Sequence, residues 1–162
     1  MPSKYRNVTS AYLHRFARGG LLLDAGEGTL GQLCRRYGRE GTDSVLRGLR
    51  AIWISHIHAD HHAGLPRLLT ARRRLLGGAA APPLPILGPR PLRRFLELYD
   101  ARVERLSHVF VDASLALGGG KAPAPFGADG ASAVAALNEA VSALGLSQLT
   151  TVEVRSHPSF FN

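Results

Sequence analysis

Residues 56–62 place four histidines and one aspartate in seven consecutive positions, and all of these side chains can bind a metal ion. A neutral imidazole nitrogen suits zinc, and a carboxylate oxygen completes a mixed nitrogen and oxygen donor set. His56 and His58 are two positions apart, so in extended backbone their side chains point the same way and can share one ion. Asp60 and His61 stand at the expected start of a helix, where they suit a second ion. A solvated histidine-rich loop explains the composition, but not the position of the cluster directly after the apolar strand expected at 51–54.

Zinc is the ion that this donor set favours, and manganese or iron suit a site richer in oxygen. Two divalent ions about 3.5 to 4 Å apart can bind a bridging hydroxide and neutralise the charge of a phosphoryl group. Four donors cannot complete two sites, so further ligands must come from elsewhere in the chain. His62 directly follows His61 and is expected to be structural or to support a ligand. Asp24 is expected to accept the distal N–H of a ligand histidine, or else to bond the amides of its own turn.

Short apolar strands alternate with amphipathic helices along the chain, which predicts an α/β layered fold. In such folds ligands gather beyond the carboxyl ends of strands, where Asp24, the histidine cluster and His157 all fall. Thr29 is expected to cap the first helix and Gly38 to end it. Strands are expected at 8–14, 21–24, 51–54, 84–87, 109–111 and 149–155, the first two antiparallel, and helices at 30–37, 42–48, 63–76, 91–99 and 132–144.

The length of 162 residues indicates one domain or part of one, with a low-complexity glycine, alanine and proline loop at 118–130. Lysine and arginine total 20 against 12 acidic residues, a formal net charge of +8. This charge favours a nucleic acid partner, although a genome rich in G and C produces the same arginine bias without selection for binding. Four arginines are expected on the solvent side of helix 63–76: Arg67, Arg72, Arg73 and Arg74.

Cys34 is the single cysteine, so the chain forms no internal disulfide, and this residue is expected to lie in the core. Neither a membrane-spanning stretch nor a secretory signal is evident. We therefore expect a soluble intracellular protein that does not act at a membrane. The sequence indicates neither an oligomeric state nor a choice among nucleus, cytosol and organelle.

The segment His56-Ile57-His58-Ala59-Asp60-His61 matches the HxHxDH pattern of the metallo-β-lactamase superfamily. Two further segments resemble the long form of ribonuclease Z, the endonuclease family that trims 3′ trailers from precursor tRNA. They are PSKYRN at 2–7, and LLLDAGEGT at 21–29 followed by GQL at 31–33. The resemblance extends from residue 2 to about residue 110. It implies an αββα sandwich of the metallo-β-lactamase fold, incomplete in this chain, so that residues 1–162 form a partial catalytic domain.

The resemblance also implies the activity and the ligands. His56 and His58 would bind one zinc ion and Asp60 and His61 the other, and Asp60 would steer the proton of the attacking water. Hydroxide held by the metal would then hydrolyse the phosphodiester of a precursor tRNA.

Three residues in the PSKYRN segment would contact the 3′ end of the tRNA by the same resemblance: Lys4, Arg6 and Asn7. On physical grounds alone they form a polar, basic segment that suits phosphates and base edges, or else a solvated terminus. The resemblance also implies a further metal-binding histidine after the strand at 149–155. His157 stands there, but a gap-free alignment of Pro158 and Phe161 with the family pattern puts Ser156 at the ligand position instead.

The bridging aspartate and later histidine of the family have no counterpart in the sequence, so we expect the 162-residue chain itself to show little or no activity. Two other functions remain open. One is a non-catalytic RNA-binding remnant that uses the arginine-rich surface. The other is a related hydrolase of the same fold that acts on a small phosphodiester or another ester, and this hydrolase would not need Lys4 or Arg6.

Overall fold

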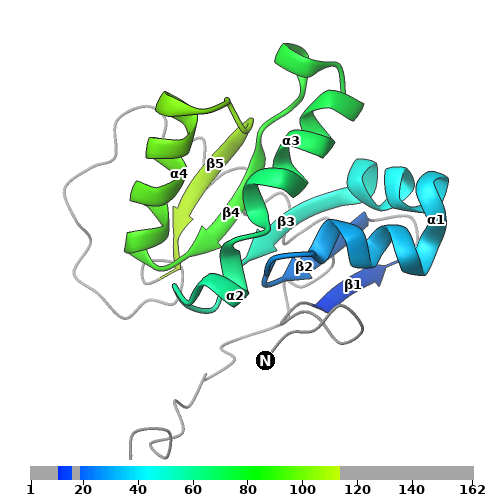
Figure 1. Cartoon of the computed structure of the whole chain (residues 1–162), viewed down its shortest axis with the longest axis horizontal. Helices are drawn as coiled ribbons and strands as arrows, with labels where there is room; N and C mark the ends of the chain where they lie inside the picture. Colours follow the sequence, from blue (N-terminus) through cyan, green and yellow to red (C-terminus); the bar gives the residue numbers. More distant parts are fainter. Residues whose placement is uncertain (1–10, 16–18, 114–162) are drawn as a thin grey trace, which may run out of the picture.

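The computed structural model of the chain describes residues 11–15 and 19–113, which form one sheet and a layer of helices (Figure 1). The sheet has the strand order β1-β2-β3-β4-β5. β1 is antiparallel to β2, as the sequence predicted, and β2 to β5 are parallel. The strands are β1 (Ala11–Arg15), β2 (Gly19–Leu23), β3 (Leu49–Trp53), β4 (Leu84–Gly88) and β5 (His108–Asp112). The predicted α/β fold is confirmed.

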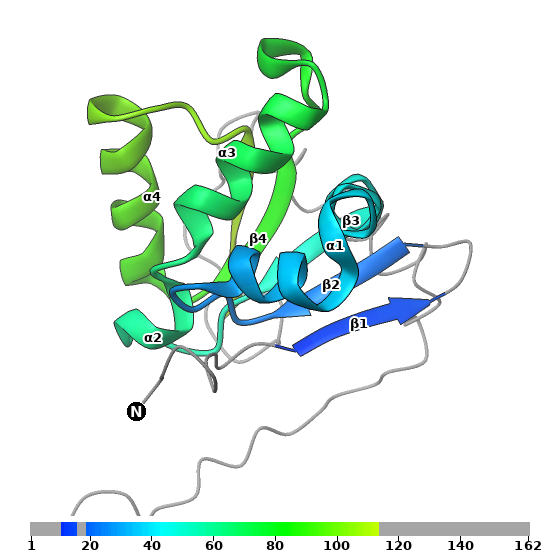
Figure 2. The ribbon, with the colours of Figure 1, turned by 45° about the vertical axis from the view of Figure 1, so that its right-hand side comes forward.

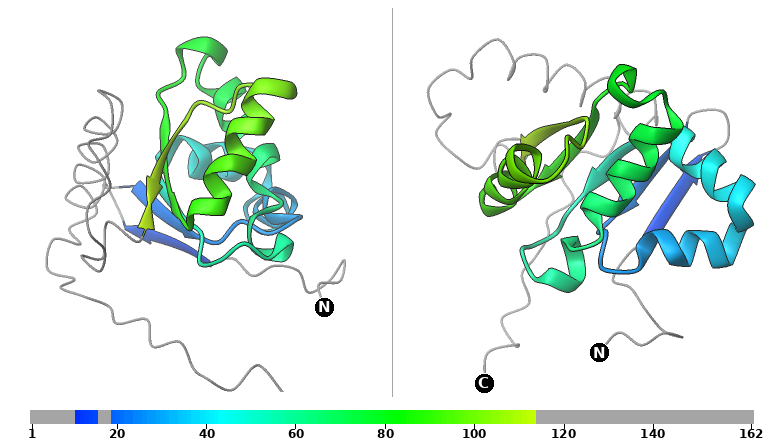
Figure 3. Two further views of the ribbon diagram at one scale, coloured as in Figure 1. Left: turned by 90° about the vertical axis from the view of Figure 1, so that its left-hand side faces the viewer. Right: turned by 45° about the horizontal axis from the view of Figure 1, so that its top comes forward.

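The helices all cover the same face of the sheet, as the view along its edge shows (Figure 3). Each parallel connection is right-handed by the general rule, and successive strands are added in one direction, so every crossover helix falls on one side. Figure 2 shows α1 and α3 in front of the strands, with α4 beside them at the left. The helical elements are α1 (Thr29–Gly48), α2 (Ala59–His62), α3 (Leu65–Leu75), the 3₁₀ turn η1 (Gly78–Ala80) and α4 (Arg90–Arg102).

The core lies between the sheet and this helix layer. Ile52 of β3 and Ile86 of β4 are fully buried, as are Leu68 of α3 and Leu96 of α4. Burying such side chains contributes roughly 1.5–3 kcal/mol each by their transfer from water. The helix stripe predicted from residues 92, 95, 96 and 99 is the face of α4 that packs on this core.

The other face of the sheet carries a second row of apolar side chains. Leu23 pairs with Trp53, Trp53 with Leu87 and Leu87 with Val111, so these four residues share one face. Val111 is buried, whereas Leu23, Trp53 and Leu87 are only partly buried.

The structure corrects the expected start of the first helix. Thr29 does not cap α1, because Gly28 holds the cap position with φ 88° and no side-chain cap bond forms. The Thr29 hydroxyl instead donates backwards to the carbonyl of Gly26 over 2.7 Å. The predicted break at Gly38 is present, since this glycine adopts φ 68°, ψ −175° inside the helical span.

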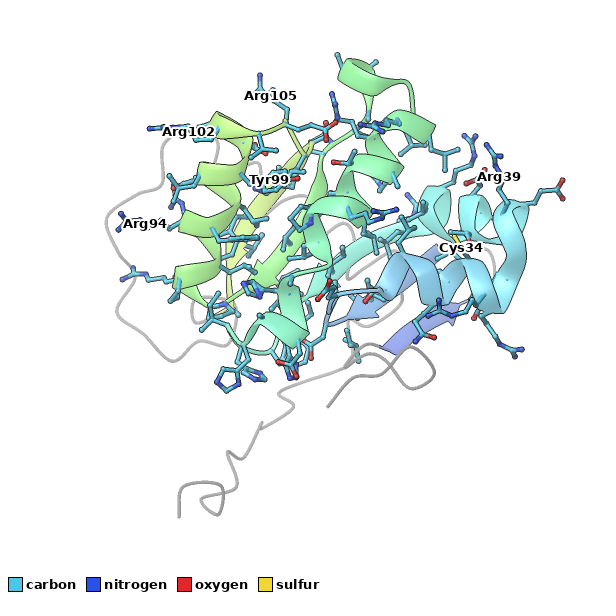
Figure 4. All side chains as sticks on the ribbon, viewed as in Figure 1. Cys34, Arg39, Arg94, Tyr99, Arg102 and Arg105 are labelled. Atoms are coloured by element: carbon cyan, nitrogen blue, oxygen red, sulfur yellow. The ribbon has the colours of Figure 1, made fainter. Side chains whose placement is uncertain are left out.

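Two further expectations are wrong. Cys34 is exposed on α1 (Figure 4), because the helix turns Thr29 and Leu33 toward the core instead. Arg72 lies not on the solvent side of α3 but on its buried face, in line with Leu65, Leu68 and Leu69. Its guanidinium reaches the carbonyl of Pro82, to which Nη1 donates over 2.8 Å. Burial, and then the charge of Arg50, lower the pKa of Arg72.

The elements expected at 132–144 and 149–155 and the low-complexity loop at 118–130 lie outside the described residues. Within residues 11–15 and 19–113, no helix has the length and apolar character needed to cross a membrane.

Candidate metal centre

The sequence-predicted donors lie at the carboxyl edge of the parallel strands. Asp24 directly follows β2, and Ser55 to His58 follow β3. Because β2 and β3 are parallel neighbours, their ends bring these two segments together. The short helix α2 then turns the chain back over the same edge and supplies Asp60 and His61.

Backbone hydrogen bonds hold the two segments in register. The amide of Asp24 donates to the carbonyl of Trp53 over 2.7 Å, and the amide of Ala25 donates to the carbonyl of His61 over 2.7 Å. The amide of Gly64 donates back to the carbonyl of Ala25 over 2.9 Å. A Cβ atom on Gly64 would lie 2.1 Å from the carbonyl oxygen of Gly26, so glycine is required by this close approach.

Asp24 connects the two segments through its carboxylate. The backbone at Asp24 has φ 57°, in the left-handed region that aspartate tolerates better than most residues. Its Oδ2 accepts a hydrogen bond from Nδ1 of His61 over 2.8 Å, and its Oδ1 accepts one from the amide of Ser55 over 2.7 Å. A carboxylate that accepts one ring N–H fixes the tautomer of the imidazole and leaves the other nitrogen as a potential ligand. For His61 the remaining nitrogen is Nε2.

At two places in the cluster, a ring nitrogen lies close to another atom that could bind a metal ion. Nε2 of His56 lies 2.9 Å from Nδ1 of His58, and Nε2 of His61 lies 3.7 Å from Oδ2 of Asp60. The ring centroids of His56 and His61 are 3.9 Å apart, so the two places adjoin. The structure therefore brings together Asp24, His56, His58, Asp60 and His61, in the pairs expected from their spacing.

The electrostatic surroundings favour an uncharged ring at His56. Burial lowers the pKa of His56, and the neighbouring His61 and His58 lower it further, against the opposing effect of Asp24 and Asp60. A histidine must be neutral to bind a metal ion, so this shift makes the ring available near neutral pH.

His62 does not face the other histidines. It is buried, with 9% exposure, and its Nδ1 donates to the carbonyl of His58 over 3.2 Å. Its ring packs on Phe95 of α4, with centroids 5.0 Å apart. Burial, and then His61, lower the pKa of His62. The remaining predicted residues, Lys4, Arg6, Asn7 and His157, lie outside the described part of the chain.

The types of side chain are those that bind zinc, since three imidazoles and one carboxylate converge at one edge of the sheet. Among residues 19–113, however, no group of three or more His, Cys, Asp or Glu side chains is arranged so that it could hold one ion. The described residues therefore fit as part of the coordination of one or two ions, and further ligands are needed.

Ser55 is the residue that the sequence did not single out. Its hydroxyl lies within hydrogen-bond distance of Asp24, His56 and His61. A serine between a strand and a histidine cluster carries no signal by itself, and its partners are set by the contact between β2 and β3.

Comparison with known proteins relates this geometry to a family. No family model matches the chain. A mitochondrial tRNase Z of Arabidopsis thaliana is 60% identical over 111 residues, which cover 68% of this chain and 12% of the relative. The human zinc phosphodiesterase ELAC protein 2 is 43% identical over 110 residues, 67% of this chain and 13% of that protein. The chain is a ribonuclease Z homologue.

Solved structures agree with this relationship. The crystal structure of a long form ribonuclease Z from yeast matches with a TM-score of 0.56 and 27% identity, and the match covers 69% of this chain and 16% of that one. The described sheet and helices thus match part of the fold of a solved ribonuclease Z, in agreement with the α/β fold expected from the sequence. The chain spans about an eighth of the length of the ribonuclease Z relatives that it matches.

Proposed function

We propose that this chain provides part of the metal site of an endonuclease that removes the 3′ trailer from precursor tRNA. The observation that carries the proposal is the convergence of His56, His58, Asp60 and His61 at one sheet edge in a chain homologous to ribonuclease Z. The matched proteins are named tRNase Z and zinc phosphodiesterase, which supports tRNA as substrate and zinc as metal.

In this proposal His56 and His58 hold one divalent ion, and Asp60 and His61 hold the other. Such ions supply a strong nucleophile at neutral pH and neutralise charge on the phosphoryl group. Zinc suits the histidine-rich donors, and manganese suits a site with more oxygen ligands. Asp60, whose side chain is 47% exposed, is proposed to steer the proton of the attacking water. His157 is proposed as a further ligand.

Lys4, Arg6 and Asn7 are proposed to contact the 3′ end of the tRNA. Their cationic and amide groups suit phosphate oxygens and base edges. Asp24 has a supporting role, because its carboxylate holds His61. His62 is proposed to support the loop from the buried side, through its bond to the carbonyl of His58.

The test is a chimera in which residues 1–110 of this chain replace the matching segment of the human relative. We expect the chimera to cleave a precursor tRNA at the trailer junction in the presence of zinc, and Asp60→Ala to reduce the rate at least 100-fold. The Glu27→Gln chimera, changed at an exposed carboxylate outside the cluster, is the matched control. A folded chimera without cleavage would contradict the proposal. We expect the 162-residue chain alone to cleave little or not at all.

The second candidate function is RNA binding without catalysis. It is favoured by the incomplete donor set of the described residues and by the net charge of +8. In that case tRNA binding is sensitive to salt, because phosphate contacts supply the affinity, and it survives the double change His56→Ala and His58→Ala. The RNA-binding function alone is supported if the chain binds tRNA while the chimera fails to cleave it.

A further inference from the structure

Ser55 stands at the junction of β3 and the histidine loop, with its hydroxyl close to three ionisable side chains. Its Oγ lies 2.9 Å from both carboxylate oxygens of Asp24 and 2.9 Å from Nδ1 of His56. Nδ1 of His61 is farther away, at 3.3 Å, and is already bonded to Asp24. The backbone N–H of Ser55 also donates to Asp24. Ser55 is thus held on Asp24 at two points while its hydroxyl reaches His56.

The number of hydrogens decides the direction of each bond. A serine hydroxyl carries one hydrogen and two lone pairs, and an ionised carboxylate only accepts. The Ser55 hydrogen must therefore point to Asp24, since otherwise two oxygens would face each other over 2.9 Å without a proton between them. With that hydrogen used, Oγ can only accept from His56, so Nδ1 of His56 carries a proton.

The consequence reaches the proposed ligand atom. When Nδ1 of His56 carries the proton, Nε2 has the free lone pair, and Nε2 is the nitrogen that faces His58 over 2.9 Å. In the chain without an ion, the proton between these two nitrogens then belongs to Nδ1 of His58. A ligand histidine whose other ring nitrogen donates a hydrogen bond is held in orientation and tautomer.

We propose that Ser55 is a positioning residue that extends the hold of Asp24 to His56, so that one carboxylate sets the tautomer of two histidines. Asp24 acts on His61 directly and on His56 through the Ser55 hydroxyl. In the proposed function, His56 and His61 belong to different ion sites. The importance of this arrangement for metal binding therefore rests on the proposed function. The tautomer itself is a property of the chain without metal or RNA.

The experiment measures the tautomers directly. The chain is labelled with ¹⁵N in its imidazole rings, and long-range ¹H–¹⁵N spectra are recorded without metal near pH 8, above the ordinary imidazole pKa of about 6.5. We expect Nδ1–H at both His56 and His61 in the wild-type chain. Ser55→Ala should remove the preference at His56 and leave His61 unchanged, because Asp24 holds His61 directly. Ser55→Thr keeps a hydroxyl and should restore Nδ1–H at His56.

A second readout is zinc affinity, measured by competition with a chelating dye. We expect Ser55→Ala to weaken zinc binding about 10- to 100-fold, the usual effect of losing a partner behind a ligand, and Ser55→Thr to stay near the wild type. An Nε2–H tautomer at His56 in the wild-type chain would overturn the inference, whether or not the variants fold. Equal weakening by Ser55→Thr would also overturn it. Failure of the chimera to cleave tRNA would contradict the proposed function and leave the tautomer result intact.

Discussion

At the residue scale, the site depends on Asp24, which lies far in sequence from the groups it bonds. Its carboxylate accepts from His61 and from both the amide and the hydroxyl of Ser55. Charge-assisted bonds of this type are stronger than those between neutral groups. The carboxylate thus combines two roles, which are joining the ends of β2 and β3 and orienting the rings.

Asp24→Asn removes the negative charge of the side chain and keeps its size and shape. Asparagine tolerates the left-handed backbone of this position, but its NH₂ group would face donors that now bond a carboxylate. We expect zinc affinity to fall about 10- to 100-fold, as is usual when such a partner is lost. The measurement is dye competition, with Asp43→Asn on α1 as the matched control. Equal loss in the two variants would contradict the role given to Asp24.

At the element scale, the site is built by the contact of the turn after β2 with the junction of α2 and α3. Hydrogen bonds of Ala25 with His61 and Gly64 close this contact. A second contact involves α2 and α4, in which the ring of His62 packs on the ring of Phe95. The elements therefore hold the loop from two directions, and strain at either contact would move the donor side chains.

Gly64→Ala tests the first contact. The new Cβ would lie 2.1 Å from a backbone oxygen, which cannot move as a flexible side chain can. We expect the free energy of unfolding to fall by about 1–3 kcal/mol, the usual range for overpacking. Gly31→Ala is the matched control, because its Cβ meets only Arg35 Nη1 at 3.6 Å and the helix gains about 0.5–1 kcal/mol. Thermal unfolding followed by circular dichroism compares them, and an unchanged Tm for Gly64→Ala would contradict the close approach.

The contact of β5 with α4 should make stability depend on pH. His108 begins β5, and its Nδ1 lies 3.8 Å from Oδ2 of Asp100 without a hydrogen bond. Burial lowers the pKa of His108, against the opposing charges of Asp100 and Glu97. The unfolded chain therefore takes up a proton at higher pH than the folded one, and stability present above about pH 6.5 is lost as the pH falls below it.

His108→Leu should reduce this dependence. The measurement is Tm between pH 8 and pH 5, for the wild type and the variant. The lowered pKa values of His56 and His62 act in the same direction, so part of the dependence should remain. A variant as sensitive to acid as the wild type would show that His108 is not responsible.

At the scale of the whole molecule, one face of the sheet carries the helices and one edge carries the proposed metal site. α4 begins directly after β4, at the same edge as the histidines, so its first turns border the site. Arg94 projects from this helix, whereas Arg39 projects from α1 on the other side of the molecule (Figure 4). An RNA strand that reaches the site would pass α4 more closely than the tip of α1.

Arg94→Ala should therefore weaken tRNA binding more than Arg39→Ala. Each lost phosphate contact reduces the slope of log affinity against log salt concentration by about 0.7 to 0.9. We expect this reduction for Arg94→Ala and no change of slope for Arg39→Ala, in fluorescence titrations between 50 and 200 mM salt. The same slope change in both variants would indicate general charge attraction in place of a path along α4.

Local features of this protein follow from the sequence alone. The alternation of apolar strands and helices predicted the α/β fold, and Gly38 predicted the break in α1 because glycine readily adopts a positive φ. The spacing of His56 and His58 predicted that they share a side. Such features depend on neighbours in the chain, and they also carry the resemblance to ribonuclease Z.

Only the tertiary structure decided which distant groups meet. The contact of Asp24 with His61, 37 positions along the chain, arises from the pairing of β2 with β3, and so does the hydroxyl network of Ser55. Arg72 and Cys34 were assigned to the wrong environments because residue type does not decide which side of a helix is covered. The long arginine side chain lies on the buried face of α3 and reaches a carbonyl, whereas the thiol lies beyond the covered face of α1. Burial and side-chain partners are set by packing between elements, which local spacing does not specify.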